Sequence, residues 1–366
     1  MHDRPAGGGP GIAPGVEISR YRQADREALL EFRRDHYGAD AAQADPAYID
    51  WQFRDAPQIA GLGPPLVVAR REGKIVGALG TIRTYLHFEG RSLPASWAID
   101  FAVRKELRRA GIGENLSLVS REEAGTRLII EASAPTRGIV ARAHYDSVCD
   151  VPLLVRPLDP AAWLRSHRVP AALASLAGAG RPLLAALQAR ALGAARSLGV
   201  ELAETRGFDE RADALFQVHA LRYPLLCRRD REWLEWRFEK YPQPGRYRLH
   251  WLMRKGEAVG YAVLRPGAHH GIPSGVLVDY LCAPELIPAL LALCLERFRT
   301  EGAAVATCLH LSPFAAGAFR SAGFFRRSSG WRFLARAGPG VEPARILDPR
   351  SWFVTAGDTN VDRVRR

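Results

Sequence analysis

Sulfur-containing residues are scarce in this chain. Five of its 366 residues are cysteines and two are methionines. No two cysteines have the two-residue spacing of a zinc or redox motif, and an odd number of widely spaced thiols does not fit a disulfide framework. His269 and His270 stand in a Gly/Pro-rich loop without further metal-ligating residues at a suitable spacing. We therefore expect no metal site, and the free thiols favour the reducing cytoplasm.

Long apolar runs are also missing. No stretch approaches the roughly 20 consecutive apolar residues of a transmembrane helix. The N-terminal segment, 1–15, is rich in glycine and proline and contains no apolar core of a signal peptide. We expect this segment to be a disordered lead-in and the chain to have no transmembrane span.

Acidic residues are outnumbered: 39 Asp and Glu stand against 51 Lys and Arg, a net charge of +12. A basic chain can bind nucleic acid, an anionic membrane or a small anion. Here the arginines are scattered and no nucleic-acid-binding motif occurs. We attribute the overall charge to an arginine-rich, alanine-rich composition and expect no nucleic-acid partner.

Apolar residues make up 47% of the chain, which is enough for two hydrophobic cores. Short alternating strands, such as 16–21, 66–70 and 75–83, are interspersed with amphipathic helices, the first at 24–36. The predicted fold class is therefore α/β, of the α+β type. We expect two domains, each a mixed, mostly antiparallel twisted sheet flanked by helices.

The second half of the sequence repeats a pattern of the first. One polar and three aromatic residues recur with identical spacing: Asp45, Tyr48, Trp51 and Phe53, then Asp230, Trp233, Trp236 and Phe238. Gly73 and Gly256 open matching hairpin motifs, and Asp100 and Asp279 end matching β-rich runs. The three matches keep their order and a nearly constant offset, which indicates an internal duplication. We predict domains at 16–160 and 206–340, a connector at 161–205 and a tail at 341–366.

The connector is rich in alanine, leucine and arginine and should be helical. Its arginines suggest one interpretation, a helix on a membrane surface facing lipid phosphates. The other is a pair of helices between the domains that covers apolar surface. We favour the second, so peripheral membrane contact remains the less favoured alternative.

The residues that indicate chemistry follow a strand at 97–103. A short connection leads to Arg108, Arg109, Ala110, Gly111, Ile112 and Gly113. An apolar helix face begins at Ile112, so the glycines lie at a strand-to-helix junction. A helix N-terminus has unpaired N–H groups and a positive dipole end, and glycines let an anion approach the backbone. We expect a phosphate site. It is not a Walker A or a Rossmann loop, because neither glycine pattern is complete.

This stretch resembles motif A of the GCN5-related N-acetyltransferases, in which an Arg or Gln is separated by two residues from a Gly-x-Gly or Gly-x-Ala. The resemblance covers about residues 16–157. It departs from many relatives at Lys105, where they have proline. It implies an acetyl-CoA cosubstrate without metal, with its pyrophosphate on the loop and its pantetheine arm along the end of the strand. The implied cofactor-binding residues are Phe101, Ala102, Val103, Arg108, Arg109, Ala110, Gly111, Ile112 and Gly113.

A second, partial resemblance lies around Tyr145. The family has a tyrosine here that protonates the leaving thiolate, but Cys149 and Asp150 stand where Gly-Phe is usual. We take Tyr145 as the candidate general acid, against a tyrosine that only packs. Asp100, beside the predicted pantetheine strand, is the candidate base or substrate-orienting acid, against a structural aspartate. Glu131 is a second candidate.

The second half retains Asp279 but lacks the glycine-rich element, so it is expected to be a degenerate copy without coenzyme binding. The resemblance implies direct transfer of an acetyl group to a primary amine, such as a small amine or an amino sugar. Two alternatives remain: an aminoacyl or long-acyl transferase of the Fem-like type, and a non-catalytic coenzyme A-binding module.

Overall fold

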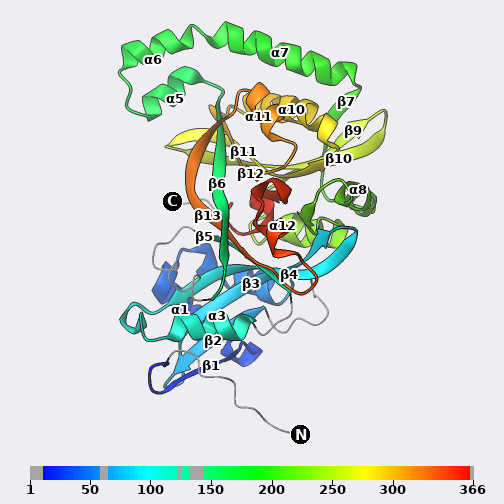
Figure 1. Cartoon of the computed structure of the whole chain (residues 1–366). Coiled ribbons are helices and arrows are strands. Elements are labelled where there is room, and N and C mark those ends of the chain that lie inside the picture. The colour runs from blue at the N-terminus through cyan, green and yellow to red at the C-terminus, as the bar shows by residue number, and fades with distance from the viewer. Residues whose placement is uncertain (1–10, 58–64, 122–124, 132–142, 363–366) are drawn as a thin grey trace. The chain divides into compact units, whose positions relative to one another are not determined.

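The computed structural model describes residues 11–57, 65–121, 125–131 and 143–362, and Figure 1 labels its elements. The chain forms two compact units. The first comprises Met1–Leu86, Ser92–Cys149 and Arg332–Leu347, and the second comprises His87–Arg91, Asp150–Trp331 and Asp348–Arg366. Each unit is mixed α/β, which confirms the predicted fold class. Neither unit is one continuous stretch of sequence.

The first unit is built on a twisted sheet with strand order β1-β2-β3-β4-β5-β13. The strands are β1 (Val16–Arg20), β2 (Leu66–Arg71), β3 (Lys74–Phe88), β4 (Arg91–Val103), β5 (Thr126–Glu131) and the end of β13 (Phe325–Arg336). Pairing is antiparallel between β1 and β2, β2 and β3, and β5 and β13, and parallel between β4 and β5. The last strand therefore comes from a distant, C-terminal part of the sequence, and Phe333 stacks on Trp97 of β4.

Helices cover both faces of this sheet. On one face α1 (Arg26–Tyr37) and α2 (Pro46–Phe53) pack on Leu66 and Val68, and on the other α3 (Ile112–Arg121) packs on Val67 and Ala69. The change of face at each residue of β2 is the period-two alternation of a strand. The remaining helical segment, α12 (Pro343–Leu347), follows β13.

The second unit has strand order β6-β12-β11-β10-β9-β7. These strands are β6 (Asp146–Pro157), β7 (Val200–Thr205), β9 (Arg248–Arg254), β10 (Glu257–His269), β11 (Ile272–Cys282) and β12 (Val305–Leu311), and two short strands, β8 (Leu225–Cys227) and β14 (Trp352–Thr355), pair with each other. The helices are α5 (Pro160–Ser166), α6 (Ala171–Gly178), α7 (Arg181–Ser197), α8 (Arg211–Ala220), α9 (Arg231–Leu234), α10 (Ile287–Thr300) and α11 (Ala316–Ser321).

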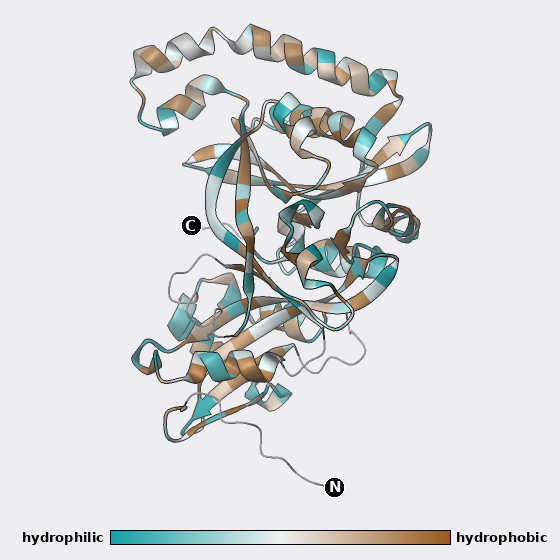
Figure 2. Cartoon of the chain, viewed as in Figure 1, coloured by the Kyte–Doolittle hydropathy of each residue, from teal (hydrophilic) through white to brown (hydrophobic). Residues whose placement is uncertain are grey.

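The segment predicted as a helical connector is helical from α5 to α7, but its last part, Val200–Thr205, is strand β7 of the second sheet. Its long helix α7 lies alongside α10 (Figure 1), where the buried Gln188 side chain donates a hydrogen bond to the Ala292 carbonyl at 2.8 Å. Hydrophobic and hydrophilic residues alternate along α7, whereas α6 consists of apolar and small residues (Figure 2). Among the described side chains of these helices, Leu173, Leu183 and Leu187 are exposed. No helix in the described ranges is both long and apolar enough to cross a bilayer.

In both sheets two parallel strands pair over only a short segment. In the first unit β4 and β5 pair from Ala95 to Trp97. In the second, β11 and β12 pair from Ser274 to Val276. The two paired segments are separated in the sequence by the same offset as Asp100 and Asp279. Among the described residues, β4 has no further pairing with β5, and β11 none with β12, beyond these segments.

The C-terminal tail is bound to the second unit by two buried arginines. Arg237 donates to the Thr359 carbonyl at 2.6 Å and to the Asp362 carboxylate at 2.9 Å. Arg229 donates to Asp358 at 2.6 Å. Within this tail, Trp352–Thr355 is strand β14 and Ala356–Asp358 is a short 3-10 helix.

Candidate functional site

The loop between β4 and α3 has an unusual backbone. Arg109 and Gly111 both have positive φ angles, +69° and +74°. At Gly111 a Cβ atom would lie 2.6 Å from the carbonyl oxygen of Gly11, so no larger residue fits without a shift. The neighbouring carbonyl of Ala110 accepts a hydrogen bond from the Ala13 amide at 3.0 Å. The segment that precedes β1 thus holds one side of this loop. Residues 1–10 of the predicted disordered lead-in lie outside the described residues.

Three backbone N–H groups are available at the start of α3. The first bond of the helix is donated by the Asn115 amide to the Gly111 carbonyl, at 3.1 Å. Among the described residues, the amides of Gly111, Ile112 and Gly113 donate no hydrogen bond. Consecutive free donors at the positive end of a ten-residue helix can hydrogen-bond to an anion.

The side chains around this loop add positive charge. Arg108 and Arg109 are exposed and form no ion pair within the described part of the chain, whereas Arg104 is held by Asp35 at 2.9 Å. The pKa of His36 is lowered by burial and then by the charges of Arg108, Lys105 and Arg104. The loop therefore has two mobile cations that a phosphate can engage, inside a positive field that also acts on His36.

Helix α3 is fixed on the sheet by close packing. Ile112 and Leu116 lie against Gly77 of β3, where a Cβ atom would come within 3.2 and 3.1 Å of them. Both side chains are almost completely buried. Because these residues fix the first turn of α3 on the sheet, they also fix the orientation of its free amides.

The end of β4 lies beside the loop and beyond the part that pairs with β5. Phe101 and Val103 pack with the α3 side of the sheet, while Ala102 packs with the α1 and α2 side. The strand bends just before them, because Asp100 has a φ of +51°. An extended ligand could pair with this strand edge as β5 does further back.

Asp100 points to the helices α1 and α2. Its Oδ2 atom accepts from Arg33 Nη2 and from the Tyr48 hydroxyl, each at 3.4 Å. Arg33 also donates to the Gln43 carbonyl at 3.1 Å. The carboxylate lies on the same face as Ala102, as strand alternation predicts. Tyr48 belongs to the repeated aromatic pattern, but nothing in the sequence indicated that Arg33 would be the partner.

Tyr145 stands directly before β6. It follows His144, which has a φ of +58°, and its side chain is half-buried. Its hydroxyl forms no hydrogen bond to another described residue. Residues 132–142, which precede it in the sequence, lie outside the described residues. Glu131 ends β5, where its backbone pairs with Arg332.

The corresponding position of the second unit cannot hold an anion in the same way. Helix α10 has a proline, Pro288, in its first turn, which removes an N–H group. Glu285 lies just before this helix, and its pKa is lowered by a backbone hydrogen bond and by Arg222, which donates to it at 3.2 Å. At the offset that relates Asp100 to Asp279, Ile287 and Pro288 stand where the first unit has Arg108 and Arg109, and Glu285 corresponds to Glu106.

Within the described ranges, no group of three or more His, Cys, Asp or Glu side chains is arranged to hold a metal ion. All five cysteines are free thiols. One charged residue was overlooked in the sequence. Arg156, a lone charge at the end of an apolar run in β6, is 9% exposed. The apolar residues before it in β6 were the sequence feature that could have indicated its burial.

Comparison with known proteins gives matches of structure only. No protein-family model matches the chain. No curated protein sequence matches it either.

Among solved structures, a GCN5-related N-acetyltransferase from Anabaena variabilis matches with a TM-score of 0.59 at 11% identity, covering 88% of this chain and 72% of that one. Saccharomyces cerevisiae N-myristoyltransferase, solved with myristoyl-CoA and inhibitors, matches with a TM-score of 0.55 at 13% identity, covering 93% and 87%. An Enterococcus faecalis protein described as a probable N-acyltransferase matches with a TM-score of 0.56 at 11% identity, covering 88% and 72%. At these identities the likeness establishes the fold.

Proposed function

We propose, from the premise that this chain has the GCN5-related N-acetyltransferase fold, that it transfers an acyl group from acyl-CoA to a primary amine. The observation that carries the proposal is the loop between β4 and α3. Three free amides and two unpaired arginines meet there at a helix N-terminus. A coenzyme A pyrophosphate would receive charge-assisted hydrogen bonds from both sources, each worth about 1.5–3 kcal/mol before solvent screening.

The pantetheine arm would run along Phe101, Ala102 and Val103. This part of β4 lies beyond the short segment that pairs with β5, and the arm contains amide groups that can take the place of a strand. The thioester would then reach the sheet near the bend at Asp100. The absence of further pairing between β4 and β5 among the described residues supports this course for the ligand.

In the reaction, the nitrogen of a neutral amine attacks the thioester carbonyl and the carbon–sulfur bond breaks. The amine loses a proton and the coenzyme thiolate gains one. Tyr145 is the proposed donor to the thiolate, because its hydroxyl is not engaged by any described residue. Asp100 is the proposed substrate-orienting acid. Arg33 and Tyr48 already engage the Oδ2 atom of Asp100. The alternative to Asp100 is that the amine gives its proton to bulk solvent, either through water or through Glu131.

We propose acetyl-CoA as the donor and a small amine or amino sugar as the acceptor. The structural neighbours include proteins named for acetyl transfer and for myristoyl transfer. Acyl length is therefore the part of the proposal that needs a panel of donors. The five free thiols fit a cytoplasmic protein.

We also infer that the two units arose by duplication. The short parallel pairing recurs at the offset of Asp100 and Asp279, and Asp45 and Asp230 cap the matching helices α2 and α9. Ile287 and Pro288, in place of the two loop arginines, then account for the loss of coenzyme binding in the second unit. We propose that this unit contributes stability and not a second donor site.

The deciding experiment is a thiol-release assay with acetyl-, octanoyl- and myristoyl-CoA against amines, amino sugars and peptide N-termini. Acyl-CoA-dependent thiol release that requires an amine supports the transferase. Tight coenzyme A binding without release for any pair would favour the non-catalytic binding module. Absence of coenzyme A binding would contradict the loop assignment and reopen the Fem-like alternative, which uses other donors.

A further inference from the structure

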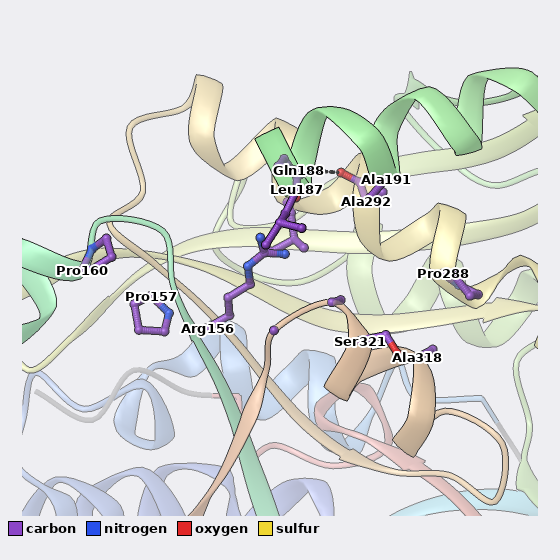
Figure 3. Close-up of a pocket in the computed structure, with 13 residues that line it drawn as sticks. Arg156, Pro157, Pro160, Leu187, Gln188, Ala191, Pro288, Ala292, Ala318 and Ser321 are labelled. Atoms are coloured by element: carbon purple, nitrogen blue, oxygen red, sulfur yellow. Dashed lines mark hydrogen bonds between the residues drawn. The ribbon is translucent and has the colours of Figure 1, made fainter. Parts of the chain in front are cut away.

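A cavity of about 350 Å³ lies in the second unit, away from every residue assigned above to acyl transfer. It is enclosed by the end of β6, by α7 and α10, and by α11 with the turn that follows it. The lining residues include Arg156, Leu187, Ala191, Ala292, Leu295 and Gly323. Figure 3 shows Arg156 extending from β6 toward Leu187 and Gln188 of α7.

Arg156 is the charged residue of this cavity, and it is not neutralised. Its side chain is 9% exposed, yet its guanidinium forms no hydrogen bond and no ion pair with any described residue. The atoms that pack against it include the backbone at Gly323, where a Cβ would lie 3.5 Å from Arg156 Nε. The pKa of Arg156 is lowered to about 10, by burial and then by the charge of Arg299. A buried, unpaired cation is costly, and such groups normally have an anionic partner.

The carboxylate nearest in the fold is already in use. A second cavity of about 280 Å³ borders the other side of Arg156, and Asp159 and Arg299 line it. Asp159 caps α5 by accepting hydrogen bonds from the amides of Ala161 and Ala162 at 3.0 and 3.1 Å. Arg299 is exposed and, like Arg156, forms no ion pair among the described residues. Two arginines therefore border one space in which Asp159 is the acidic lining residue, and the Oδ1 atom of Asp159 is engaged by the α5 amides.

The rest of the cavity wall is apolar. Leu187 and Ala191 contribute from α7, and Ala292 and Leu295 contribute from α10. Leu187 is 53% exposed although it lines the cavity, so the apolar wall reaches the surface. A volume of about 350 Å³ is within the usual range of small-molecule sites, roughly 300–1,000 Å³.

We propose that this cavity binds an amphipathic anion: one carboxylate or phosphate head group held by Arg156, and a hydrocarbon chain along Leu187, Ala191 and Leu295. Arg299 lines the second cavity, which shares Arg156 with this one, and adds positive charge there. The planar guanidinium can engage either head group through two parallel N–H bonds. The hydrocarbon chain removes the apolar wall from water. The site does not depend on the acyl-CoA loop, which is formed by other residues in the first unit.

Calorimetric titration and thermal unfolding of the full chain would test this site with five probes. Decanoate and decyl phosphate have both features, 1-decanol lacks the charge, and acetate and inorganic phosphate lack the chain. We expect the two amphipathic anions to bind and raise the unfolding temperature, and the other three to have little effect. Their relative affinities distinguish a carboxylate from a phosphate ligand. Equal binding of 1-decanol would overturn the role of Arg156.

Two variants sharpen the test. Arg156→Met should weaken decanoate binding about tenfold or more. It should also leave the ligand-free unfolding temperature unchanged or higher, since it removes an uncompensated charge. A structural arginine would give the opposite result, a lower unfolding temperature. Leu187→Glu should abolish binding, whereas Leu183→Glu, an exposed leucine of the same helix outside the cavity lining, should not.

The coenzyme loop provides the last control. The Arg108→Gln/Arg109→Gln double variant should bind decanoate as the parent does, so failure of one site is distinguishable from failure of the other. An unchanged affinity in Arg156→Met, or no binding of either amphipathic anion, would refute the proposal. Binding to lipid vesicles that survives Arg156→Met would instead indicate surface adsorption through the exposed leucines.

Discussion

Arg33 and Asp100 form a buried ion pair in the first unit, with Nη2 and Oδ2 3.4 Å apart and side-chain exposures of only 1% and 3%. The second unit has a matching pair: Asp279 accepts from Arg229 at 3.3 Å and from Thr355 at 2.6 Å. Because the second unit lacks an anion-binding loop, its aspartate cannot be kept for coenzyme chemistry. The buried aspartate at this bend therefore has a structural role in both units. A catalytic role of Asp100 would come in addition to it.

Substituting Asp100 by Asn should be strongly destabilising. Asparagine tolerates the positive φ of this position, so the main effect is to leave the buried Arg33 guanidinium without its carboxylate. Removing one partner of a buried pair costs about 3–5 kcal/mol. Unfolding in urea would measure this loss.

Asp279→Asn is the matched control for Asp100→Asn. It should cost less stability, because Arg229 keeps its ion pair with Asp358, and it should leave the affinity for acyl-CoA and the pH dependence of turnover unchanged. If Asp100 also orients substrate, its variant should alter kcat in the folded fraction while Asp279→Asn does not. Equal kinetic effects of both variants would assign Asp100 to the fold alone.

The arginines of the coenzyme loop should act on donor binding and not on the chemical step. We expect Arg108→Gln/Arg109→Gln to raise KM for acyl-CoA roughly tenfold and to change kcat little, because these contacts are the same in the ground state and the transition state. The effect should shrink at high salt, since both side chains are exposed. Arg54→Gln, an exposed arginine at the end of α2, is the control. A fall in kcat with unchanged KM would contradict the assignment.

Stability should fall below neutral pH because of His310. Its ring is buried, and burial followed by the charge of Arg229 lowers its pKa from 6.5 to about 3. His310 is therefore protonated near pH 6.5 in the unfolded chain, but only near pH 3 in the folded chain. The stability from this group is complete above pH 6.5 and is lost as pH falls through that window, about 2 kcal/mol by pH 5.

The measurement is the difference in unfolding free energy between pH 7 and pH 5 for wild type and His310→Gln. Glutamine can still bond to the Tyr280 hydroxyl, which lies 2.8 Å from the ring nitrogen. We expect the unfolding free energy of this variant to differ less between pH 7 and pH 5 than that of the wild type, whatever the absolute stability of the variant. His144→Gln, at an exposed position, should retain the wild-type difference. If His310→Gln shows the same difference in unfolding free energy as the wild type, groups other than His310 determine the pH dependence of stability.

Local features of this fold were predictable from the sequence, and long-range pairings were not. Asp45 and Asp230 indicate the helices they cap, and the glycines at 111 and 113 mark a strand-to-helix junction, because caps and turns depend on neighbouring residues. The pairing of β5 with β13 joins parts of the chain that are far apart in sequence, and no local pattern encodes that choice. The burial of Arg156 likewise depends on where α7 packs, which its own strand does not determine.

The C-terminal tail should stabilise the second unit through the pair of Arg237 and Asp362. Both side chains are buried, and Arg237 also bonds to the carbonyls of Gly357 and Thr359. Arg237→Met and Asp362→Asn should each cost about 3–5 kcal/mol, because each leaves a buried polar group without its partner. The double variant should cost clearly less than the sum of the two, since the second substitution removes a charge that the first has already isolated. Additive losses in this cycle would show that the tail is held by its backbone contacts and by β14, and that the ion pair contributes little of its own.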